Sequence, residues 1–177
     1  MARPAIIGLC GKARVGKDEV GNFILAHQGG YRYSFADPVR AMLVPLGIDM
    51  SDPYWQARKE DPIPALGVSP RRMMQTLGTE WGRELVNPDF WLLMAKQRLL
   101  NNGPGMVVTD VRFPNEAAWV RKHGLLIHVL RPDAKEVEAH TSESGVEIER
   151  DTDLQLFNTG TLDELQIAVR NMLSVYD

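Results

Sequence analysis

The chain has 177 residues, of which 44% are hydrophobic and 24% are charged, a composition that suits one globular domain with a sizeable core. Its formal net charge of −3 at pH 7 argues against a general nucleic-acid binder, which usually carries a basic stripe. A single cysteine excludes an internal disulfide. No apolar run of about 18 residues occurs, and the apolar run that ends at Cys10 leads straight into a loop. We therefore expect a cytoplasmic protein that has no signal peptide and does not contact a membrane.

The first predicted element is a buried strand, Ala5–Cys10, followed by a loop rich in glycine and lysine and then by a helix. The loop, GKARVGK, fits the phosphate-binding pattern G-x-x-x-x-G-K. Glycines let the backbone wrap an anion so that successive N–H groups point at it, Lys17 can reach the outer phosphates, and the helix adds its positive end. The nucleotide-phosphate site would comprise Gly11, Lys12, Ala13, Arg14, Val15, Gly16, Lys17, Asp18 and Glu19.

Asp18 stands where this pattern usually has a Ser or Thr whose hydroxyl contacts Mg²⁺. Asp18 and Glu19 also lie in the first turn of the predicted helix, where the helix dipole favours acidic residues whatever their function. The alternative explanation of the whole stretch is an ordinary strand–turn–helix corner that needs Gly11 and Gly16 only for its geometry.

Tyr31–Phe35 is a plausible second strand, and Asp37-Pro38 begins a helix that would place Arg40 one turn in. The proline-containing stretch Asp49–Ser69 reads as an irregular, lid-like excursion. Ser69-Pro70 then predicts a capped helix. At α-helical spacing its polar face comprises Arg72, Gln75, Thr76, Thr79 and Arg83, and its apolar face Met73, Leu77 and Trp81.

This polar face could simply contact solvent, as the polar faces of many helices do. Solvent-facing helices usually favour Glu and Lys, however, whereas Arg, Gln and Thr offer donors that suit anions and base edges. We therefore favour a binding role for the face.

A further helix from Asn87 to about Leu100 precedes a third strand, Met106–Val108, that ends at Thr109-Asp110 like a Walker-B strand. Period-two geometry puts Asp110 and Arg112 on one side of this strand end, either at a ligand site or as a surface salt bridge. Residue 111 is Val rather than a water-activating Glu, and no N-K-x-D motif occurs, which points away from ATPase motors and GTPase switches.

The remaining chain predicts a helix at Asn115–Lys122, strands at Leu125–Leu130 and Leu154–Phe157, and a helix at Leu162–Leu173 capped by Thr161. Between these strands the charged stretch 133–153 could be a lid over the phosphates or a solvated helix pair, with Arg131 and Arg150 the better candidates for phosphate contact. The alternation of strands and helices predicts an α/β fold of the P-loop NTPase type, with three layers, a central parallel sheet of about five strands covered by helices on both faces, and a small lid.

Six stretches follow one another along almost the whole chain: GKARVGKD, SFADPVR, SPRRMMQTLGTEWGR, TDVRFPNEA, HTSE and NTGTLDEL. Together they resemble the bacteriophage deoxynucleoside monophosphate kinases, a branch of the P-loop nucleoside monophosphate kinases. In that family an Asp also follows the P-loop lysine, so Asp18 becomes a family trait. Glu19 departs from the family pattern, where a small hydroxyl residue or Tyr is expected.

The resemblance implies transfer of the γ-phosphoryl group of ATP, with Mg²⁺, to a deoxynucleoside 5′-monophosphate for phage DNA replication. It implies one P-loop kinase domain over residues 1–177, with an acceptor-binding excursion at about 38–101 and a lid at about 132–153. Lys17, Arg14, Arg131 and Arg150 would act on the transferring phosphoryl group, and Asp18 and Asp110 would hold Mg²⁺. The acceptor would contact Ala36, Asp37, Arg40, Arg72, Gln75, Gly78, Thr79, Trp81, Arg83, Asp110 and Arg112.

The implied partner is a small molecule rather than nucleic acid or a membrane, and the location is the host cytoplasm if a phage encodes the chain. The oligomeric state stays open, with a homodimer among the alternatives. The rival functions are another small-molecule P-loop kinase, such as a phosphomevalonate-type kinase that shares the G-K-D loop, and a non-catalytic nucleotide-sensing module.

Overall fold

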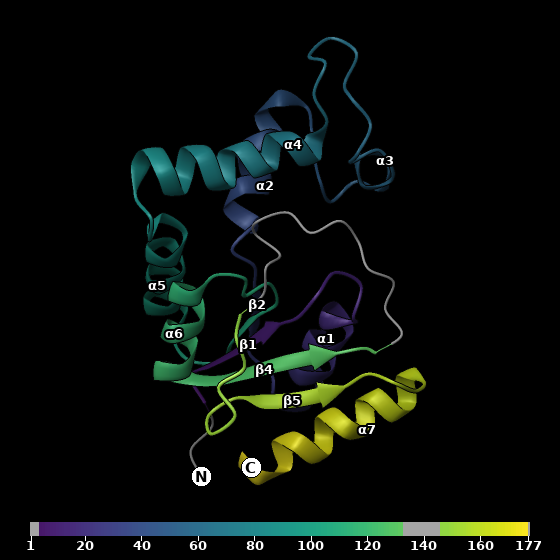
Figure 1. The fold of residues 1–177 in the computed structure, drawn as a ribbon, viewed down its shortest axis with the longest axis vertical. Coiled ribbons are helices and arrows are strands. Elements are labelled where there is room, and N and C mark those ends of the chain that lie inside the picture. The colour runs from purple at the N-terminus through teal and green to yellow at the C-terminus, as the bar shows by residue number, and fades with distance from the viewer. Residues whose placement is uncertain (1–3, 133–145, 177) are drawn as a thin grey trace. The chain divides into compact units, whose positions relative to one another are not determined.

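A computed structural model of the chain describes residues 4–132 and 146–176. The chain divides into two compact units, one formed by Met1–Ser34 with Gln97–Asp177 and the other by Phe35–Lys96 (Figure 1). The second unit overlaps most of the stretch 38–101 that the sequence analysis assigns to acceptor binding. That assignment stays a prediction.

The first unit is built on a parallel sheet of five strands in the order β2-β3-β1-β4-β5, which confirms the predicted α/β class. The strands β2 and β3 end together at the pair Tyr33–Val108, and β4 and β5 end together at the pair Leu130–Phe157; β1 ends between these two levels, with Cys10 opposite His128. The carboxyl ends of parallel strands form the edge at which ligands bind in such folds. The strands are β1 (Ile6–Cys10), β2 (Tyr31–Tyr33), β3 (Met106–Val108), β4 (Gly124–Leu130) and β5 (Leu154–Phe157).

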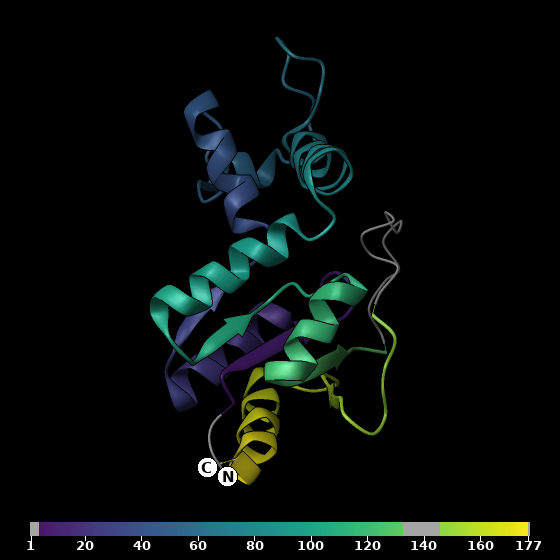
Figure 2. The ribbon, with the colours of Figure 1, turned by 90° about the vertical axis from the view of Figure 1, so that its left-hand side faces the viewer.

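Helices cover both faces of this sheet (Figures 1 and 2). On one face Leu9 of β1 packs in a core with Ile24 of α1 (Lys17–Gln28) and Val169 of α7 (Leu162–Leu173), which a short 3₁₀ turn, Ser174–Tyr176, extends. On the other face α6 (Pro114–His123) approaches β1 so closely that a Cβ on Gly8 would lie 2.8 Å from the Val120 side chain. The three predicted layers are therefore present.

The second unit is helical and has its own small core of Leu43, Ile48 and Met50, against which Met73 and Leu77 pack. Within the proline-containing stretch 49–69 the only helix is α3, in agreement with the predicted irregular excursion, and Ile63 forms an isolated antiparallel bridge with Val68. The helices are α2 (Asp37–Leu43), the 3₁₀ turn Val44–Leu46, α3 (Pro53–Ala57), α4 (Pro70–Gln75), the π-helix Thr76–Val86, and α5 (Phe90–Asn102), which continues past the unit boundary.

The helix predicted from Ser69 begins as expected, because the Ser69 hydroxyl accepts a hydrogen bond from the Arg72 amide at 3.2 Å. From Thr76 to Val86, however, it is a π-helix with i→i+5 hydrogen bonds, which end with the Asn87 amide on the Gly82 carbonyl at 3.0 Å. The turns of a π-helix are wider than those of an α-helix, so the α-helical spacing used for the prediction does not apply beyond Gln75. The polar face and its binding role stay predictions.

Packing explains why the helix widens. The Gly78 carbonyl accepts hydrogen bonds from Trp91 Nε1 at 2.7 Å and from Arg83 Nη1 at 2.9 Å. These bonds occupy an acceptor that an α-helix would have given to the Gly82 amide. Trp81 accordingly packs with Phe90 and Trp91, with ring centroids 5.4 Å and 6.3 Å away, instead of extending the apolar face of Met73 and Leu77.

No helix in the described ranges is long and apolar enough to cross a membrane. Most of the predicted lid, including the HTSE motif at 140–143, lies outside the described residues. The described part of that stretch, 146–153, has an irregular path with a turn at 150–152, and no helix forms there.

Candidate active site

The loop between β1 and α1 has the backbone geometry that its glycines predict. Gly11 and Gly16 have φ values of 140° and 96°, and a Cβ on Gly11 would lie 2.4 Å from the Val129 carbonyl oxygen. Arg14, at φ 63°, is the one non-glycine residue with positive φ in the described part of the chain. Val15 is buried in the core beneath the sheet edge. The buried Val15 side chain thus anchors the loop to the core. Gly11, Arg14 and Gly16 have a positive φ, which L-residues seldom adopt.

Lys17 is the first residue of α1, and its ammonium group turns back over the loop. Nζ donates hydrogen bonds to the carbonyl oxygens of Gly11 at 2.7 Å and Lys12 at 2.6 Å. Burial lowers the pKa of Lys17, and the nearby Arg112 guanidinium lowers it further, while the carboxylates of Asp18 and Asp110 act in the opposite direction. Lys17 thus feels the charges of the neighbouring Asp18 and of two residues from a distant motif, Asp110 and Arg112.

Asp110 and Arg112 reach this place through the chain that leaves β3. The Thr109 amide donates to the Tyr33 carbonyl, and the Val111 amide to the Leu9 carbonyl, each at 3.0 Å, so the chain continues between the ends of β2 and β1. The Ser34 hydroxyl donates a 2.6 Å hydrogen bond to Asp110 Oδ2. Asp110 therefore lies at the carboxyl edge of the sheet, where the Walker-B comparison predicts it.

Glu116 fixes the backbone on which Arg112 is mounted. Its carboxylate is buried, and Oε2 accepts hydrogen bonds from the backbone amides of Arg112 at 2.9 Å and Phe113 at 3.1 Å. These bonds satisfy amides at the start of α6 that no helical carbonyl can reach. Glu116 belongs to the TDVRFPNEA motif, yet the sequence analysis gives it no role.

Asp18 forms an ion pair with Arg32 of β2, and its side chain is 74% exposed. Arg32 is a second residue that the sequence analysis does not single out. Arg131 directly follows β4, at the edge where Gly11 approaches Val129, and Arg150 lies in the turn before β5; both side chains are exposed. The phosphate contacts of Arg14, Arg131 and Arg150, and the place of Glu19 in the nucleotide-phosphate site, remain predictions.

The remaining predicted acceptor residues lie in the helical unit. Arg40 pairs with Asp37 at 2.8 Å, and Arg72 pairs with Glu80 at 3.0 Å. Arg83 is held by the Gly78 carbonyl. The other predicted acceptor residues of this unit are Ala36, Gln75, Thr79 and Trp81.

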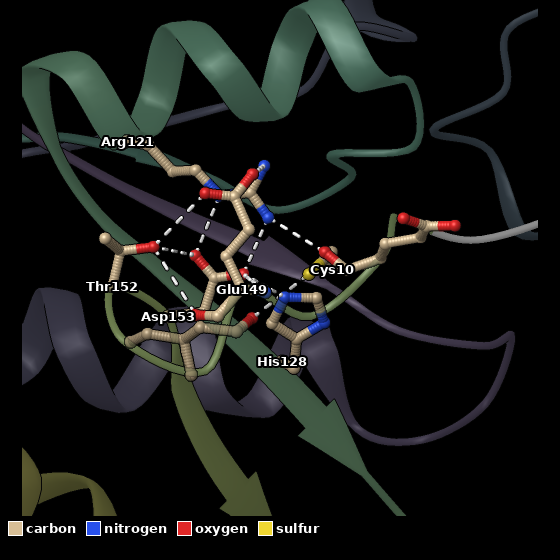
Figure 3. A network of polar contacts seen from close by, with 8 residues as sticks. Cys10, Arg121, His128, Glu149, Thr152 and Asp153 are labelled. Carbon is tan, nitrogen blue, oxygen red and sulfur yellow. Dashed lines mark hydrogen bonds and ion pairs between the residues drawn. The ribbon is translucent and has the colours of Figure 1, made fainter.

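Beneath the sheet edge the structure contains a buried ion-pair network that sequence reasoning missed (Figure 3). Arg121 of α6 donates from Nε and Nη2 to the two oxygens of Asp153, at 2.8 Å and 2.6 Å, and His128 Nε2 lies 2.8 Å from Asp153 Oδ2. Burial opposes ionisation of Asp153, but the hydrogen bonds from Arg121, the Glu149 amide and His128 outweigh it and hold the pKa of Asp153 well below its usual range.

This network connects Asp153, the residue before β5, to Arg121 of α6 and His128 of β4, on the face of the sheet that α6 covers. Arg121 also pairs with Glu149 at 2.7 Å and donates to the Glu147 carbonyl at 2.8 Å. Cys10, the last residue of β1, lies on the same face, and its thiol contacts the Ile127 carbonyl. Burial raises the pKa of the Cys10 thiol to about 12, and the charge of Asp153 adds to this effect. Cys10 is therefore a packing residue rather than a nucleophile.

Comparison with known proteins agrees with this geometry. The profile of the family described as deoxynucleotide monophosphate kinase matches residues 64–169, which is more than half of the chain. The chain is 40% identical over 97 residues to the deoxynucleoside-5′-monophosphate kinase of Escherichia phage T5, a match that covers 50% of this chain and 39% of that protein. It is 28% identical over 175 residues to a putative deoxynucleotide monophosphate kinase of Acanthamoeba polyphaga mimivirus, covering 90% of this chain and 91% of the relative.

Among solved structures, a gluconokinase from Sinorhizobium meliloti 1021 superposes with a TM-score of 0.56 at 13% identity, over 99% of this chain and 94% of that chain. This likeness shows a shared fold. The match to the phage T5 relative spans less than half of that relative's length.

Proposed function

Because the chain belongs to the deoxynucleotide monophosphate kinase family, we propose that it transfers the γ-phosphoryl group of ATP to a deoxynucleoside 5′-monophosphate, giving ADP and the diphosphate. The observation that carries the proposal is the group of charges around Lys17. Asp18 comes from α1, and Asp110 and Arg112 come from the chain after β3. Motifs about a hundred residues apart thus converge on one edge of the sheet.

Phosphoryl transfer needs little covalent chemistry from the protein, because its main requirements are alignment and neutralisation of the transferring charge. Lys17 supplies a cation at the loop, where the outer phosphates of ATP would lie. Burial and Arg112 disfavour its charged form. The negative charge of a polyphosphate beside Lys17 would raise the pKa of Lys17 again. The charged ammonium group, which burial and Arg112 destabilise in the free protein, would therefore be stabilised when the nucleotide binds.

The acids beside Lys17 fit a magnesium ion. Mg²⁺ usually takes one or two carboxylates, several waters and phosphate oxygens rather than a complete protein cage. Asp18 and Asp110 provide two carboxylates near Lys17, and the described residues contain no cluster of three or more acids, histidines or cysteines that could form such a cage. When bound, Mg²⁺ would neutralise charge on the phosphate oxygens. Asp110 accepts a hydrogen bond from Ser34, which would orient it as a ligand, and Asp18 forms an ion pair with Arg32.

The acceptor monophosphate would bind to the arginines of the helical unit. Arg72 and Arg40 are exposed and held by acidic neighbours, so their guanidinium groups are oriented without being buried. Arg83 of the π-helix, whose guanidinium group donates a hydrogen bond to the Gly78 carbonyl, would supply a further positive charge. Forked guanidinium donors suit phosphate oxygens, and Gln75 and Thr79 would supply hydrogen bonds to the sugar and base. Arg14, Arg131 and Arg150 would neutralise the transferring group.

A panel of acceptors tests the proposal. Purified protein with ATP and Mg²⁺ is offered the four deoxynucleoside monophosphates, the matching ribonucleotides and phosphomevalonate, and ADP formation is followed for each. We expect rapid ADP formation with at least one deoxynucleotide and slow background hydrolysis without an acceptor. Turnover of phosphomevalonate alone would favour the rival kinase, and nucleotide binding without any transfer would favour a sensing module.

A further inference from the structure

The turn between β5 and α7 contacts the phosphate loop through one buried side chain. Asn158 is 8% exposed, and its Nδ2 donates a 2.9 Å hydrogen bond to the carbonyl oxygen of Val15. The two residues are 143 positions apart in sequence. Asn158 opens the NTGTLDEL motif, to which the proposed mechanism assigns no role.

The direction of this bond matters because a trans peptide is planar, and its C=O and N–H groups point in opposite directions. The carbonyl of Val15 and the amide of Gly16 belong to the same peptide. A carbonyl held toward Asn158 therefore turns the Gly16 amide away from Asn158. In a loop of this kind, successive amides directed into the concavity are what bind an anion.

The surroundings leave this arrangement little freedom. A Cβ on Gly16 would lie 2.6 Å from Asn158 Nδ2, so the close approach requires glycine at that position. The Asn158 amide donates to the Leu130 carbonyl at 2.7 Å, which fixes its backbone to the end of β4. Thr161 and Glu164 then form a reciprocal capping box that holds the turn at the start of α7.

We propose that Asn158 is a positioning residue for nucleotide binding: it holds the Val15–Gly16 peptide so that the Gly16 amide faces the bound phosphates. The inference rests on the proposed function only in taking those phosphates to be those of a nucleotide. The side-chain carbonyl of Asn158 cannot perform this role, because two acceptors would face each other. An amide donor at this position is therefore required.

The test compares Asn158→Asp with Glu164→Gln as a matched control from the same turn. The Asp variant keeps the side-chain shape but replaces the donor with a carboxylate, whereas the Gln variant weakens the capping box and leaves the bond to Val15 in place. Calorimetric titration with MgADP and with MgATP gives nucleotide affinity. Kinetics with the best acceptor give separate KM values, and thermal unfolding gives Tm.

We expect Asn158→Asp to weaken nucleotide binding by at least about tenfold, the effect of leaving a buried carbonyl without its donor, and to change the acceptor KM less than twofold. Glu164→Gln should lower Tm while leaving nucleotide affinity within about twofold of wild type. Equal nucleotide affinity in Asn158→Asp and wild type would overturn the inference, as would an equal loss in Glu164→Gln. The uncharged Asn158→Ser variant, whose hydroxyl is too short to reach Val15, should also lose at least about tenfold in nucleotide affinity. Full affinity in Asn158→Ser would mean that the loss in Asn158→Asp comes from repulsion between the new carboxylate and the phosphates, and would overturn the inference. If the Asp variant does not fold, Asn158→Ser alone decides.

The binding measurement separates the two proposals. A wild-type protein that binds nucleotide but transfers phosphate to no monophosphate overturns the proposed function and leaves the role of Asn158 to be decided by the affinities alone. Normal transfer by the wild type with unchanged affinity in Asn158→Asp overturns only the role of Asn158. A wild-type protein that binds neither nucleotide overturns both.

Discussion

The Ser34 hydroxyl donates a 2.6 Å hydrogen bond to the Asp110 carboxylate, joining the residue after β2 to the acid after β3. This bond orients one oxygen of the carboxylate that we propose as the magnesium ligand. Partners that orient a metal ligand typically contribute 10-fold to 100-fold in metal affinity or activity. We therefore expect Ser34 to affect magnesium binding, although its sequence context, SFADPVR, does not reveal its partner.

The Ser34→Ala variant should need about tenfold more Mg²⁺ for half-maximal activity, because the Asp110 carboxylate loses the hydrogen bond from the Ser34 hydroxyl that orients it. Activity is measured across a magnesium titration at saturating ATP and acceptor. Ser174→Ala is the matched control, since the Ser174 hydroxyl bonds locally to the Asn171 carbonyl at the end of the chain. An unchanged magnesium requirement in Ser34→Ala would show that Asp110 needs no such orientation or is not the ligand.

The Asp153→Asn variant should be destabilised by about 3–5 kcal/mol at pH 7, because the mostly buried Arg121 would lose its buried carboxylate and keep only the exposed Glu149 as an ionic partner. Chemical denaturation measures the free energy of unfolding. Asp151→Asn, in the exposed turn two residues earlier, is the control and should lie within about 0.5 kcal/mol of wild type. A variant as stable as wild type would contradict the structural role given to this ion pair.

The same carboxylate predicts how stability depends on pH. Since the pKa of Asp153 is lowered in the folded protein, its ionised form stabilises the fold at pH values above the ordinary value of about 3.9. That stabilisation is lost as the pH falls from about 4 toward the lowered folded value, because the unfolded chain takes up the proton first. Wild type should therefore lose more stability than Asp153→Asn between about pH 5 and pH 2. If the free energy of unfolding fell with pH equally in the two proteins, the lowered pKa of Asp153 would be contradicted.

Two glycines of the π-helix should respond in opposite ways to alanine. A Cβ on Gly82 would lie 2.7 Å from the Trp91 ring, so Gly82→Ala should be destabilised by about 1–3 kcal/mol through overpacking. A Cβ on Gly78 would meet only Val39, at 3.9 Å, so Gly78→Ala should be neutral or slightly stabilising because alanine restricts the unfolded chain. Urea denaturation compares the two. Equal effects would mean that Trp91 does not pack against the helix as described.

Local sequence signals predict much of the first unit. The phosphate loop, the Thr161 cap and the five strands follow from motifs and periodicity, because each depends on residues near one another in the chain. The gathering of Asp110 and Arg112 near Lys17 follows from a general rule, since parallel strands end at one edge.

The features that the sequence could not predict are those made by distant contacts. The π-helix depends on Trp91 binding the Gly78 carbonyl, a tertiary interaction that overrides α-helical periodicity. The Asn158 bond to Val15 and the burial of Asp153 against Arg121 join residues with no periodic relationship. Ser34, Glu116 and Asn158 all lie within the motifs quoted for the family resemblance, but a motif alone does not say which backbone or side-chain group each one contacts.

We propose that Lys17 and the charged residues near it stabilise the phosphoryl group that passes from ATP to a deoxynucleoside monophosphate. The most direct measurement is single-turnover transfer from γ-labelled ATP to the best acceptor by wild type and Lys17→Ala, with Lys122→Ala, an exposed lysine of α6, as the matched control. We expect labelled diphosphate with wild type and Lys122→Ala, and a rate about 100-fold to 1,000-fold lower with Lys17→Ala, because a cation at the transferring phosphates is lost. Labelled diphosphate formed by Lys17→Ala at the wild-type rate would contradict the claim.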